Sequence, residues 1–348
     1  YTSIAQLEAA LSYYPKGTIV FAPALGTTPP QHIRDHFRIF CNCPRTKDMY
    51  VLPYSIPFDR EPTQHGNARS RWLSFIGSLR ANTWRIAMFN TNWNYPTYFR
   101  IIPTYFHACD EPTVVFEYSS HYESGHLIVP SYTYARMSSK AELAADYWKE
   151  LESYEFILCP IGDHHGSQRL IEAAYAGAFP ILIGDPLMTS VPACIRDLVL
   201  SFPARIDIED VVTAYEIPEA LLYRSDDLTV IEQGVSPAWV YNPDQRATLS
   251  LPAPIGTLLE AHKAKLAPEP YEEGEHCIEC STGTAQLFPA EGCRCHISPP
   301  CNACDTNRPR CDTCGSEEKP ADAFSRTRLL HPRNLGEYIA YELLHRNP

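Results

Sequence analysis

The stretch over residues 154–185, YEFILCPIGDHHGSQRLIEAAYAGAFPILIGD, constrains the fold of this chain more than any other segment. An apolar run at residues 156–158 leads into a polar turn that contains glycine, and a second apolar run occupies residues 180–183. Between them the pattern predicts a helix over residues 168–176, which Gly177 ends in a left-handed conformation. This order predicts one strand–helix–strand unit of a parallel sheet.

The loop before this helix has the features of a phosphate-binding loop. It follows the carboxyl end of a predicted strand and precedes a helix N-terminus, where backbone N–H groups and the helix dipole favour an anion. Gly162, Gly166 and Ser167 belong to the loop, and Ser167 also stands where it can cap the helix. We therefore expect these three residues to contact a bound phosphate.

Two charged residues of the predicted helix lie three positions apart and share one face. Arg169 is in the first turn, within reach of an anion held at the loop, and its planar guanidinium suits a diphosphate through paired hydrogen bonds. Glu172 could accept hydrogen bonds from ribose hydroxyls. A surface ion pair between Arg169 and Glu172 is the alternative interpretation.

At these residues the sequence resembles the exostosin-like glycosyltransferases, which have the two-lobed GT-B architecture. The pattern S-x-R-L-x-E-A-x-x-A-G-A-x-P-I-L-I-x-D over residues 167–185 is similar to the nucleotide-sugar motif of that family. Two upstream segments add to the resemblance. They are R-W-L-S-F-I-G over residues 71–77, with Asn82 and Arg85 beyond it, and D-M-Y-V-L-P-Y-S-I-P over residues 48–57.

The resemblance implies transfer of a hexosyl or pentosyl group from a nucleotide-sugar donor, with a UDP-sugar expected. It implies that Arg169 contacts the diphosphate and that Glu172 contacts the ribose. Arg71, Arg85 and Asp185 are further candidates for contacts to the donor. The acceptor lobe of the family is larger than the segment that precedes Arg71, so we expect a small acceptor lobe, a trimmed chain, or acceptor contacts that come from elsewhere.

Sugar transfer with inversion needs a base for the acceptor hydroxyl and stabilisation of the leaving diphosphate. The candidates for the base are His121 and Glu123, in a polar segment after a predicted strand, and Asp163 and His164, in the loop before the helix. The histidine could instead bind phosphate or remain solvated. Because no D-x-D pair stands at a predicted strand end, we expect chemistry that needs no metal.

The tail of the chain carries eight of the 13 cysteines, in three C-x-x-C pairs and one C-x-C pair. This segment has almost no apolar residues, so we expect two structural zinc ions, each held by four thiolates, to stabilise it. Disulfides in an oxidising compartment are the alternative. Spacing leaves open which thiols share an ion. The candidate ligands are Cys277, Cys280, Cys293, Cys295, Cys301, Cys304, Cys311 and Cys314.

Alternating predicted strands and helices indicate an α/β fold with parallel sheets built from Rossmann-like units, and the resemblance implies that their arrangement is GT-B-like. Among the predicted elements are a helix over residues 140–153, a strand over 197–202 and helices over 208–216 and 255–265. Four parts are expected: a short N-terminal α/β lobe on the acceptor side (1–68), a nucleotide-sugar-binding domain (69–265), a cysteine-rich zinc module (266–325) and a C-terminal helix (326–348) that packs on the main domain.

Charge and hydropathy exclude some classes of protein. The net charge of −12 argues against a chain that coats nucleic acid over its whole surface. No apolar run approaches the ~20 residues of a membrane span, and the amphipathic start is not a signal peptide. We therefore expect no membrane partner and a cytoplasmic location, which is the host cytoplasm if the protein is viral.

The leading hypothesis is a glycosyltransferase that uses a nucleotide sugar. Its acceptor is open: a hydroxymethylated DNA base in a viral or phage setting, a glycan and a protein are the candidates. The alternative is a catalytically inactive, nucleotide-binding α/β protein that docks on a protein partner through its zinc tail. A nucleic-acid-binding zinc protein is a third hypothesis.

Overall fold

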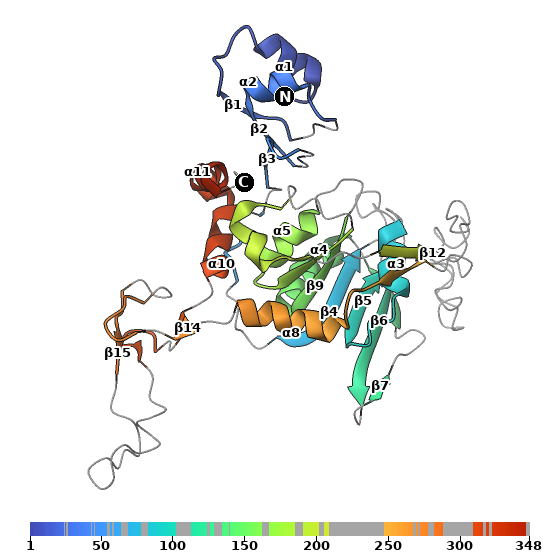
Figure 1. The fold of residues 1–348 in the computed structure, drawn as a ribbon. Coiled ribbons are helices and arrows are strands. Elements are labelled where there is room, and N and C mark those ends of the chain that lie inside the picture. The colour runs from blue at the N-terminus through green and yellow to red at the C-terminus, as the bar shows by residue number, and fades with distance from the viewer. Residues whose placement is uncertain are drawn as a thin grey trace.

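The computed structural model describes residues 1–23, 25, 27–42, 44, 46–53, 56–57, 59–63, 69–77, 83–101, 113–123, 126–128, 134–138, 140–161, 167–184, 191–201, 205–208, 247–266, 269–270, 272–277, 282–287, 309–315, 318–319 and 322–345. Within these residues the chain forms an N-terminal lobe, a larger α/β domain with the C-terminal helix beside it, and a cysteine module that stands apart (Figure 1). The α/β class and the parallel sheets expected from the sequence are confirmed.

The N-terminal lobe is a small parallel sheet with two helices. Its strands lie in the order β1-β2-β3, and both neighbouring pairs are parallel. The lobe has a hydrophobic cluster of its own, in which Leu7, Ile33 and Ile39 are fully buried. Its elements are α1 (Ile4–Ala10), β1 (Ile19–Phe21), α2 (Gln31–His36), β2 (Arg38–Cys41) and β3 (Tyr50–Val51).

An eight-stranded sheet forms the centre of the larger domain. The neighbouring strands β11-β10-β9-β4-β5 are all parallel, and the antiparallel β6, β7 and β8 extend the sheet beyond β5. These strands are β4 (Ser70–Gly77), β5 (Thr97–Ile101), β6 (Thr113–Glu123), β7 (His126–Ile128), β8 (Tyr134–Ser138), β9 (Tyr154–Pro160), β10 (Phe179–Ile183) and β11 (Leu200–Ser201).

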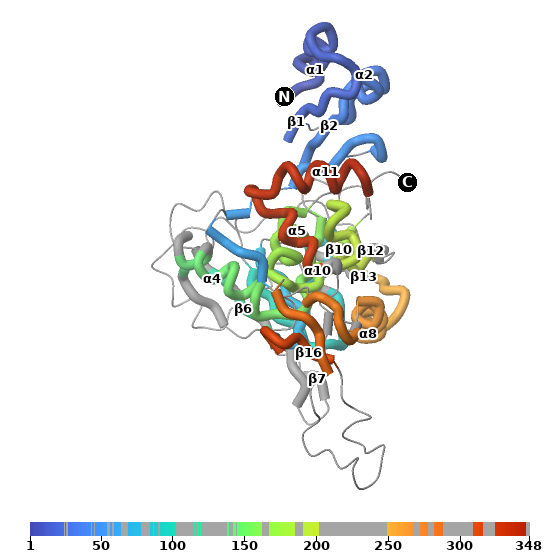
Figure 2. The backbone as a smooth tube through the Cα atoms, turned by 90° about the vertical axis from the view of Figure 1, so that its left-hand side faces the viewer, coloured from blue at the N-terminus to red at the C-terminus, as the bar shows by residue number. Residues whose placement is uncertain are grey.

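Helices connect the parallel strands and cover both faces of the sheet. The crossover from β4 to β5 moves across the sheet in one direction, and the crossover from β9 to β10 moves in the other. Because both crossovers are expected to be right-handed, the helices of these two connections lie on opposite faces of the sheet. Figure 2 shows α4 and α8 on opposite sides of the sheet. The helices predicted over residues 140–153 and 255–265 are confirmed. The connecting elements are α3 (Thr83–Asn90), α4 (Lys140–Ser153), α5 (Gln168–Tyr175) and a 3-10 helix η3 (Ala193–Leu198), whereas α8 (Ile255–Lys265) follows the strands of this sheet in the chain.

The end of α5 follows the sequence prediction closely. Gly177 has a φ of +76°, its N–H donates to the carbonyl of Ala174 at 3.0 Å, and the N–H of Ala178 donates to the carbonyl of Ala173 at 2.9 Å. This pair of bonds is a Schellman motif, in which the left-handed residue is most easily a glycine. Arg69 holds the same corner, since its guanidinium donates to the carbonyls of Leu151, Tyr154 and Ala176.

Two predicted elements differ from the structure. The strand expected over residues 197–202 is wrong in its first half, because η3 continues to Leu198 and only Leu200–Ser201 pairs with β10. Pro192 precedes this 3-10 helix, and the apolar residues of the helix are buried against the core. The helix expected over residues 208–216 does not include residue 208. That residue ends β12 (Arg205–Ile208), which pairs with β13 (Ala247–Ser250), and the remainder lies outside the described residues.

The amphipathic C-terminal helix packs on the larger domain, as expected, and it also contacts the N-terminal lobe. On α11 (Leu335–His345), the buried Tyr338 hydroxyl donates to the Val51 carbonyl at 2.8 Å. The buried Glu342 carboxylate accepts from the N–H of Val51 at 3.4 Å and from the N–H of Ala193 at 2.8 Å. Figures 1 and 2 both show α11 between the N-terminal lobe and the larger domain. The preceding elements are α10 (Asp322–Ser325), η5 (Arg326–Leu330) and η6 (Pro332–Asn334).

In its described residues, the cysteine module forms short pairs of strands. β14 (Glu269–Pro270) pairs with β17 (Glu318–Lys319), and β15 (Ala285–Gln286) pairs with β16 (Arg310–Cys311), both antiparallel. Among the residues that the structure describes, no helix is long and apolar enough to cross a membrane.

Candidate functional site

The order of the parallel strands reverses between β4 and β9. From β4 the chain adds β5 on one side, and later adds β9, β10 and β11 on the other side. In open α/β sheets, ligands bind outside the carboxyl ends of the strands at such a reversal, because the connecting loops diverge there and leave a crevice. In this chain the carboxyl ends are Gly77 of β4 and Pro160 of β9.

Arg169 reaches the carboxyl end of β4 from the first turn of α5. Its guanidinium carbon lies 4.7 Å from the centre of the Phe75 ring, a cation–π contact. A Cβ added to Gly77 would lie 2.6 Å from Nη2 of Arg169, and Gly77 has a φ of +149°. The positive φ favours glycine at this strand end, and a side chain here would displace the end of the flexible Arg169 side chain.

The guanidinium keeps hydrogen-bonding capacity. Its Nε is buried and has no hydrogen-bond partner within the described ranges of the chain. The ion pair with Glu172 that the sequence left open does not occur among the described residues, and both Glu172 oxygens accept hydrogen bonds from other side chains. Oε1 accepts from Gln168 at 2.7 Å, and Oε2 accepts from the Tyr147 hydroxyl at 2.5 Å. Arg169 thus stands at the point of strand-order reversal, next to a helix N-terminus, and no carboxylate in the described part of the chain pairs with it.

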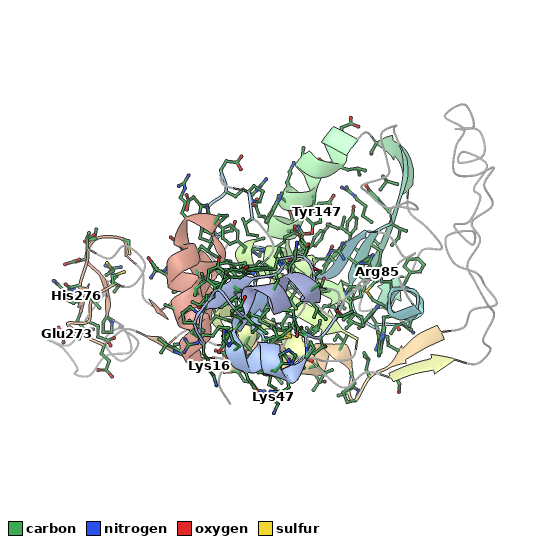
Figure 3. The ribbon with its side chains drawn as sticks, turned by 90° about the horizontal axis from the view of Figure 1, so that it is seen from above. Lys16, Lys47, Arg85, Tyr147, Glu273 and His276 are labelled. Atoms are coloured by element: carbon green, nitrogen blue, oxygen red, sulfur yellow. The ribbon has the colours of Figure 1, made fainter. Side chains whose placement is uncertain are left out.

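Glu172 is a buried carboxyl within the protein. Burial raises its pKa, and the hydrogen bond from Tyr147, the charge of Arg169 and the hydrogen bond from Gln168 act in the opposite direction. Burial also raises the pKa of Tyr147, and the Glu172 charge adds to this. Tyr147 lies on α4 (Figure 3) and was missed in the sequence, since nothing in a helical pattern distinguishes this tyrosine from a core residue.

The raised pKa of Glu172 predicts a pH dependence of stability. A carboxyl whose pKa is higher in the folded state stabilises the fold fully below its unfolded pKa, and this contribution is lost as the pH rises through the folded pKa. We expect Glu172→Gln to gain stability relative to the unchanged protein as the pH rises above the ordinary value of 4.5. Urea unfolding between pH 4 and pH 8 measures the difference, with the exposed Glu337→Gln as the control. Parallel pH profiles for Glu172→Gln and the unchanged protein would contradict the prediction.

The other predicted residues of the phosphate loop are only partly described. Ser167 stands at the N-cap of α5, as expected, but its side chain makes no capping hydrogen bond. At the end of β10, Gly184 has a φ of +137°, and a Cβ there would lie 2.7 Å from the Ile161 side chain. The remaining candidates lie outside the described residues: Gly162, Asp163, His164, Gly166 and Asp185.

The two upstream arginines occupy different ends of the domain. Arg85 lies in the first turn of α3, which follows the loop after Gly77, and is half-buried (Figure 3). Arg71 lies near the amino end of β4, with 73% of its side chain exposed and its Nε 4.0 Å from Glu155. Arg85 therefore lies at the same end of the parallel strands as the predicted site. Arg71 lies at the opposite end.

The strand register also separates His121 and Glu123 from Arg169. Ser120 of β6 pairs with Thr97, the first residue of β5, whereas Gly77 pairs with Ile101, the last residue of β5. The two ends of β5 are roughly 13 Å apart at ~3.3 Å per residue. His121 and Glu123 lie beyond Ser120, where β6 pairs with β7. The structure therefore does not bring these two residues to the carboxyl ends of β4 and β9.

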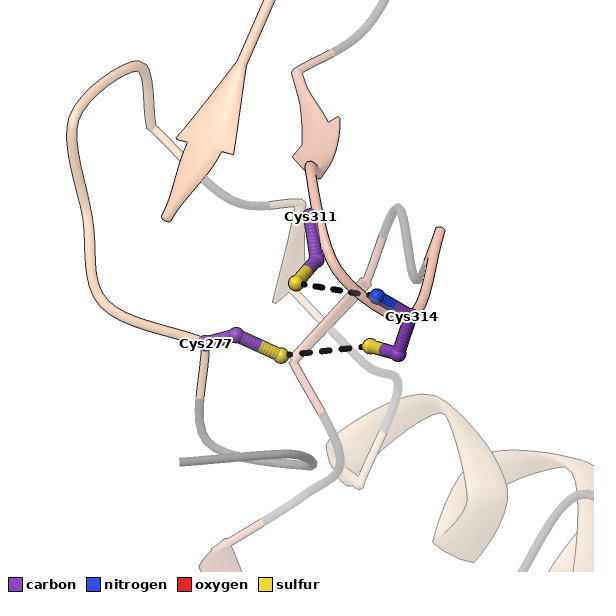
Figure 4. Close-up of side chains that lie close together, drawn as sticks. All are labelled: Cys277, Cys311 and Cys314. Atoms are coloured by element: carbon purple, nitrogen blue, oxygen red, sulfur yellow. Dashed lines mark hydrogen bonds between the residues drawn. The ribbon is translucent and has the colours of Figure 1, made fainter. Parts of the chain in front are cut away.

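A second group of candidate residues lies in the cysteine module. The Sγ atoms of Cys277, Cys311 and Cys314 all lie within 4.8 Å of one another (Figure 4). Thiols at such spacing could hold a metal ion. The other predicted ligands lie outside the described residues: Cys280, Cys293, Cys295, Cys301 and Cys304.

These observations define a class of protein: an α/β protein with an open, mostly parallel sheet, a cationic site where the strand order reverses, and a separate thiol cluster. No protein-family model matches the chain, and no curated protein matches it. The resemblance to the exostosin-like glycosyltransferases therefore stays a prediction.

Proposed function

We propose that this chain is a glycosyltransferase that binds the diphosphate of a UDP-sugar at the carboxyl ends of β4 and β9 and transfers the sugar to a hydroxyl acceptor. The observation that carries the proposal is the position of Arg169. Its guanidinium lies at the strand end beside Gly77, and its Nε has no hydrogen-bond partner among the residues that the structure describes.

The chemistry of the leaving group explains why this position matters. Departure of the sugar leaves negative charge on the diphosphate, and fixed donors aimed at that charge lower the barrier. The Phe75 ring holds the guanidinium in place before the ligand arrives, so less ordering is needed on binding. The N-terminus of α5 adds backbone N–H groups and a partial positive charge beside it. Together they supply cationic stabilisation without a metal ion.

The arrangement of the lobes supports a GT-B architecture as part of the same proposal. The N-terminal lobe has its own parallel sheet and hydrophobic cluster, and α11 returns from the end of the chain to bond to Val51 of that lobe. We place the acceptor on the side of this lobe. A DNA base, a glycan or a protein remains the acceptor to be identified. We place the base in the loop before α5, where the sequence has Asp163 and His164, because His121 and Glu123 lie toward the opposite edge.

One observation favours the alternative, a nucleotide-binding protein without catalysis. Both oxygens of Glu172 are engaged by Tyr147 and Gln168. In this arrangement the carboxylate supports the packing of α4 on α5, and no oxygen is left without a partner for a ribose hydroxyl. A domain of this kind would bind the diphosphate through Arg169 and act through a partner docked on the cysteine module.

Thermal unfolding with ligands tests the proposal. A ligand at a hundred times its Kd adds about 2.7 kcal/mol to the free energy of unfolding, and a domain of this size gains roughly 2–4 °C in Tm per kcal/mol. We expect UDP and at least one UDP-sugar to raise Tm by several degrees, and uridine, which lacks phosphates, to leave it unchanged. Release of UDP from the stabilising UDP-sugar then measures catalysis. Stabilisation without any release would favour the non-catalytic alternative, and no response to any nucleotide at millimolar concentration would rule out both.

A further inference from the structure

We propose that Cys277, Cys311 and Cys314 bind one zinc ion together, so that the first and last C-x-x-C pairs of the tail belong to one metal site. The sequence leaves open which thiols share an ion. The proposal is independent of the donor site and rests on the described part of the cysteine module alone.

The distances between the sulfur atoms fit ligands of one ion. The Sγ atoms of Cys277 and Cys314 lie 3.5 Å apart, and the three sulfurs lie within 4.8 Å of one another (Figure 4). With Zn–S bonds of about 2.3 Å, two thiolates on one tetrahedral zinc ion lie ~3.8 Å apart. A disulfide requires about 2.05 Å. The thiols are therefore spaced as ligands of a common ion.

Two backbone N–H groups of the turn point at the sulfur of Cys311. The N–H groups of Thr313 and Cys314 both donate to Sγ of Cys311, each at 3.4 Å. The turn closes through the N–H of Gly315, which donates to the Cys311 carbonyl at 2.9 Å with a φ of +77° at the glycine.

Main-chain bonds, and not only the sulfur positions, bring Cys277 to this turn. The N–H of Cys277 donates to the Gly283 carbonyl at 2.9 Å, and the N–H of Asp312 donates to the Thr284 carbonyl at 3.1 Å. The Asp312 carboxylate accepts in return from the N–H of Thr284 at 2.9 Å. Gly283 is also required by the sulfur itself, since a Cβ there would lie 2.2 Å from Sγ of Cys311.

The module has too little apolar surface to hold this arrangement by packing. Its hydrophobic cluster among the described residues consists of Cys277, Ala285 and Cys311. A domain with so small a hydrophobic core depends on a metal or on disulfides for its folding. The neighbouring His276 is exposed and does not belong to the thiol group. The thiolates are therefore the ligands that stabilise the fold here.

The assignment implies a nested order of metal sites. By sequence spacing Cys280 is the expected fourth ligand, which leaves the four cysteines between the outer pairs for a second ion. In a sequential order, the first four cysteines of the tail would bind one ion and the last four the other. Cys277 and Cys311 would then bind different ions. The four inner cysteines are Cys293, Cys295, Cys301 and Cys304.

Zinc content of the full chain distinguishes the two orders. We expect Cys277→Ala and Cys311→Ala each to lose one equivalent of zinc after dialysis against a weak chelator, and the double variant to lose that same single equivalent. If the two thiols bind different ions, the double variant loses two. The control is Cys194→Ala in η3 of the larger domain, which should keep the zinc content of the unchanged protein.

A second measurement on the unchanged protein covers the case in which a variant unfolds the whole module and loses all its metal. The protein is treated with a limiting amount of chelator and an alkylating reagent, and intact molecules are fragmented in the mass spectrometer. We expect Cys277, Cys311 and Cys314 to become alkylated together in the same molecules. Molecules with Cys277 alkylated while Cys311 and Cys314 stay protected would overturn the proposal, as would a disulfide among these thiols or a chain that binds no zinc.

Discussion

Arg169→Ala is expected to abolish the response of this protein to UDP and UDP-sugars while leaving the chain folded. The guanidinium is the cation at the carboxyl end of β4, and a charged hydrogen-bond donor contributes about 1.5–3 kcal/mol per bond. Loss of a paired contact to a diphosphate therefore weakens binding by about 100-fold or more, at 1.4 kcal/mol per factor of ten. The stabilisation by ligand and any release of UDP should disappear together.

Calorimetric titration with UDP measures this loss. Arg169→Lys keeps the charge but not the planar fork, so intermediate binding is expected. The matched control is Arg328→Ala, an exposed arginine of η5, which should bind UDP as the unchanged protein does. Equal binding by the Arg169→Ala variant and the unchanged protein would show that the diphosphate binds elsewhere, and the proposed donor site would have to be abandoned.

Of the substitutions proposed for this protein, Glu342→Ala is expected to lower the free energy of unfolding most. The carboxylate is fully buried and accepts hydrogen bonds from the N–H groups of Val51 in the N-terminal lobe and Ala193 in η3. Removing it leaves two buried donors without this acceptor, and each such donor costs about 1–3 kcal/mol. We therefore expect a loss of about 2–6 kcal/mol in the free energy of unfolding and earlier proteolysis of the N-terminal lobe.

Urea unfolding and limited proteolysis measure the two effects. Glu342→Gln retains one side-chain oxygen and should lose less than the alanine variant. Glu337→Ala changes an exposed carboxylate in the first turn of the same helix, so it should stay close to the unchanged protein. If Glu342→Ala and Glu337→Ala unfold at the same urea concentration, the contact between α11 and the lobe contributes nothing measurable.

Local patterns predicted the central elements well because the physical reasons are local. The apolar runs of β9 and β10, the amphipathic face of α4 and the glycine that ends α5 each appear in a few neighbouring residues. The 3-10 helix before β11 was missed because a short buried 3-10 segment and a short buried strand have the same composition. β12 was missed because its pairing partner, β13, lies in a distant part of the sequence.

The candidate site was predictable only in part. The sequence placed Arg169 on the first turn of a helix after a strand. It could not show that Gly77 and Phe75 of β4 would lie beside the guanidinium, since strand neighbours are chosen by packing across the whole sheet. The same reason explains His121 and Glu123, which follow a strand in the sequence. Only the antiparallel register of β6 on β5 directs them away from the carboxyl ends of the parallel strands.

The amino-acid sequence by itself determined the alternation of helices and strands, the stop at Gly177 and the eight clustered thiols, because these depend on residues close together in the chain. The tertiary structure alone decided the reversal of strand order between β4 and β9, the engagement of Glu172 by Tyr147, and the meeting of Cys277 with Cys311 and Cys314. These contacts join segments far apart in the chain, and their geometry follows from hydrogen-bonded register and burial in the assembled fold.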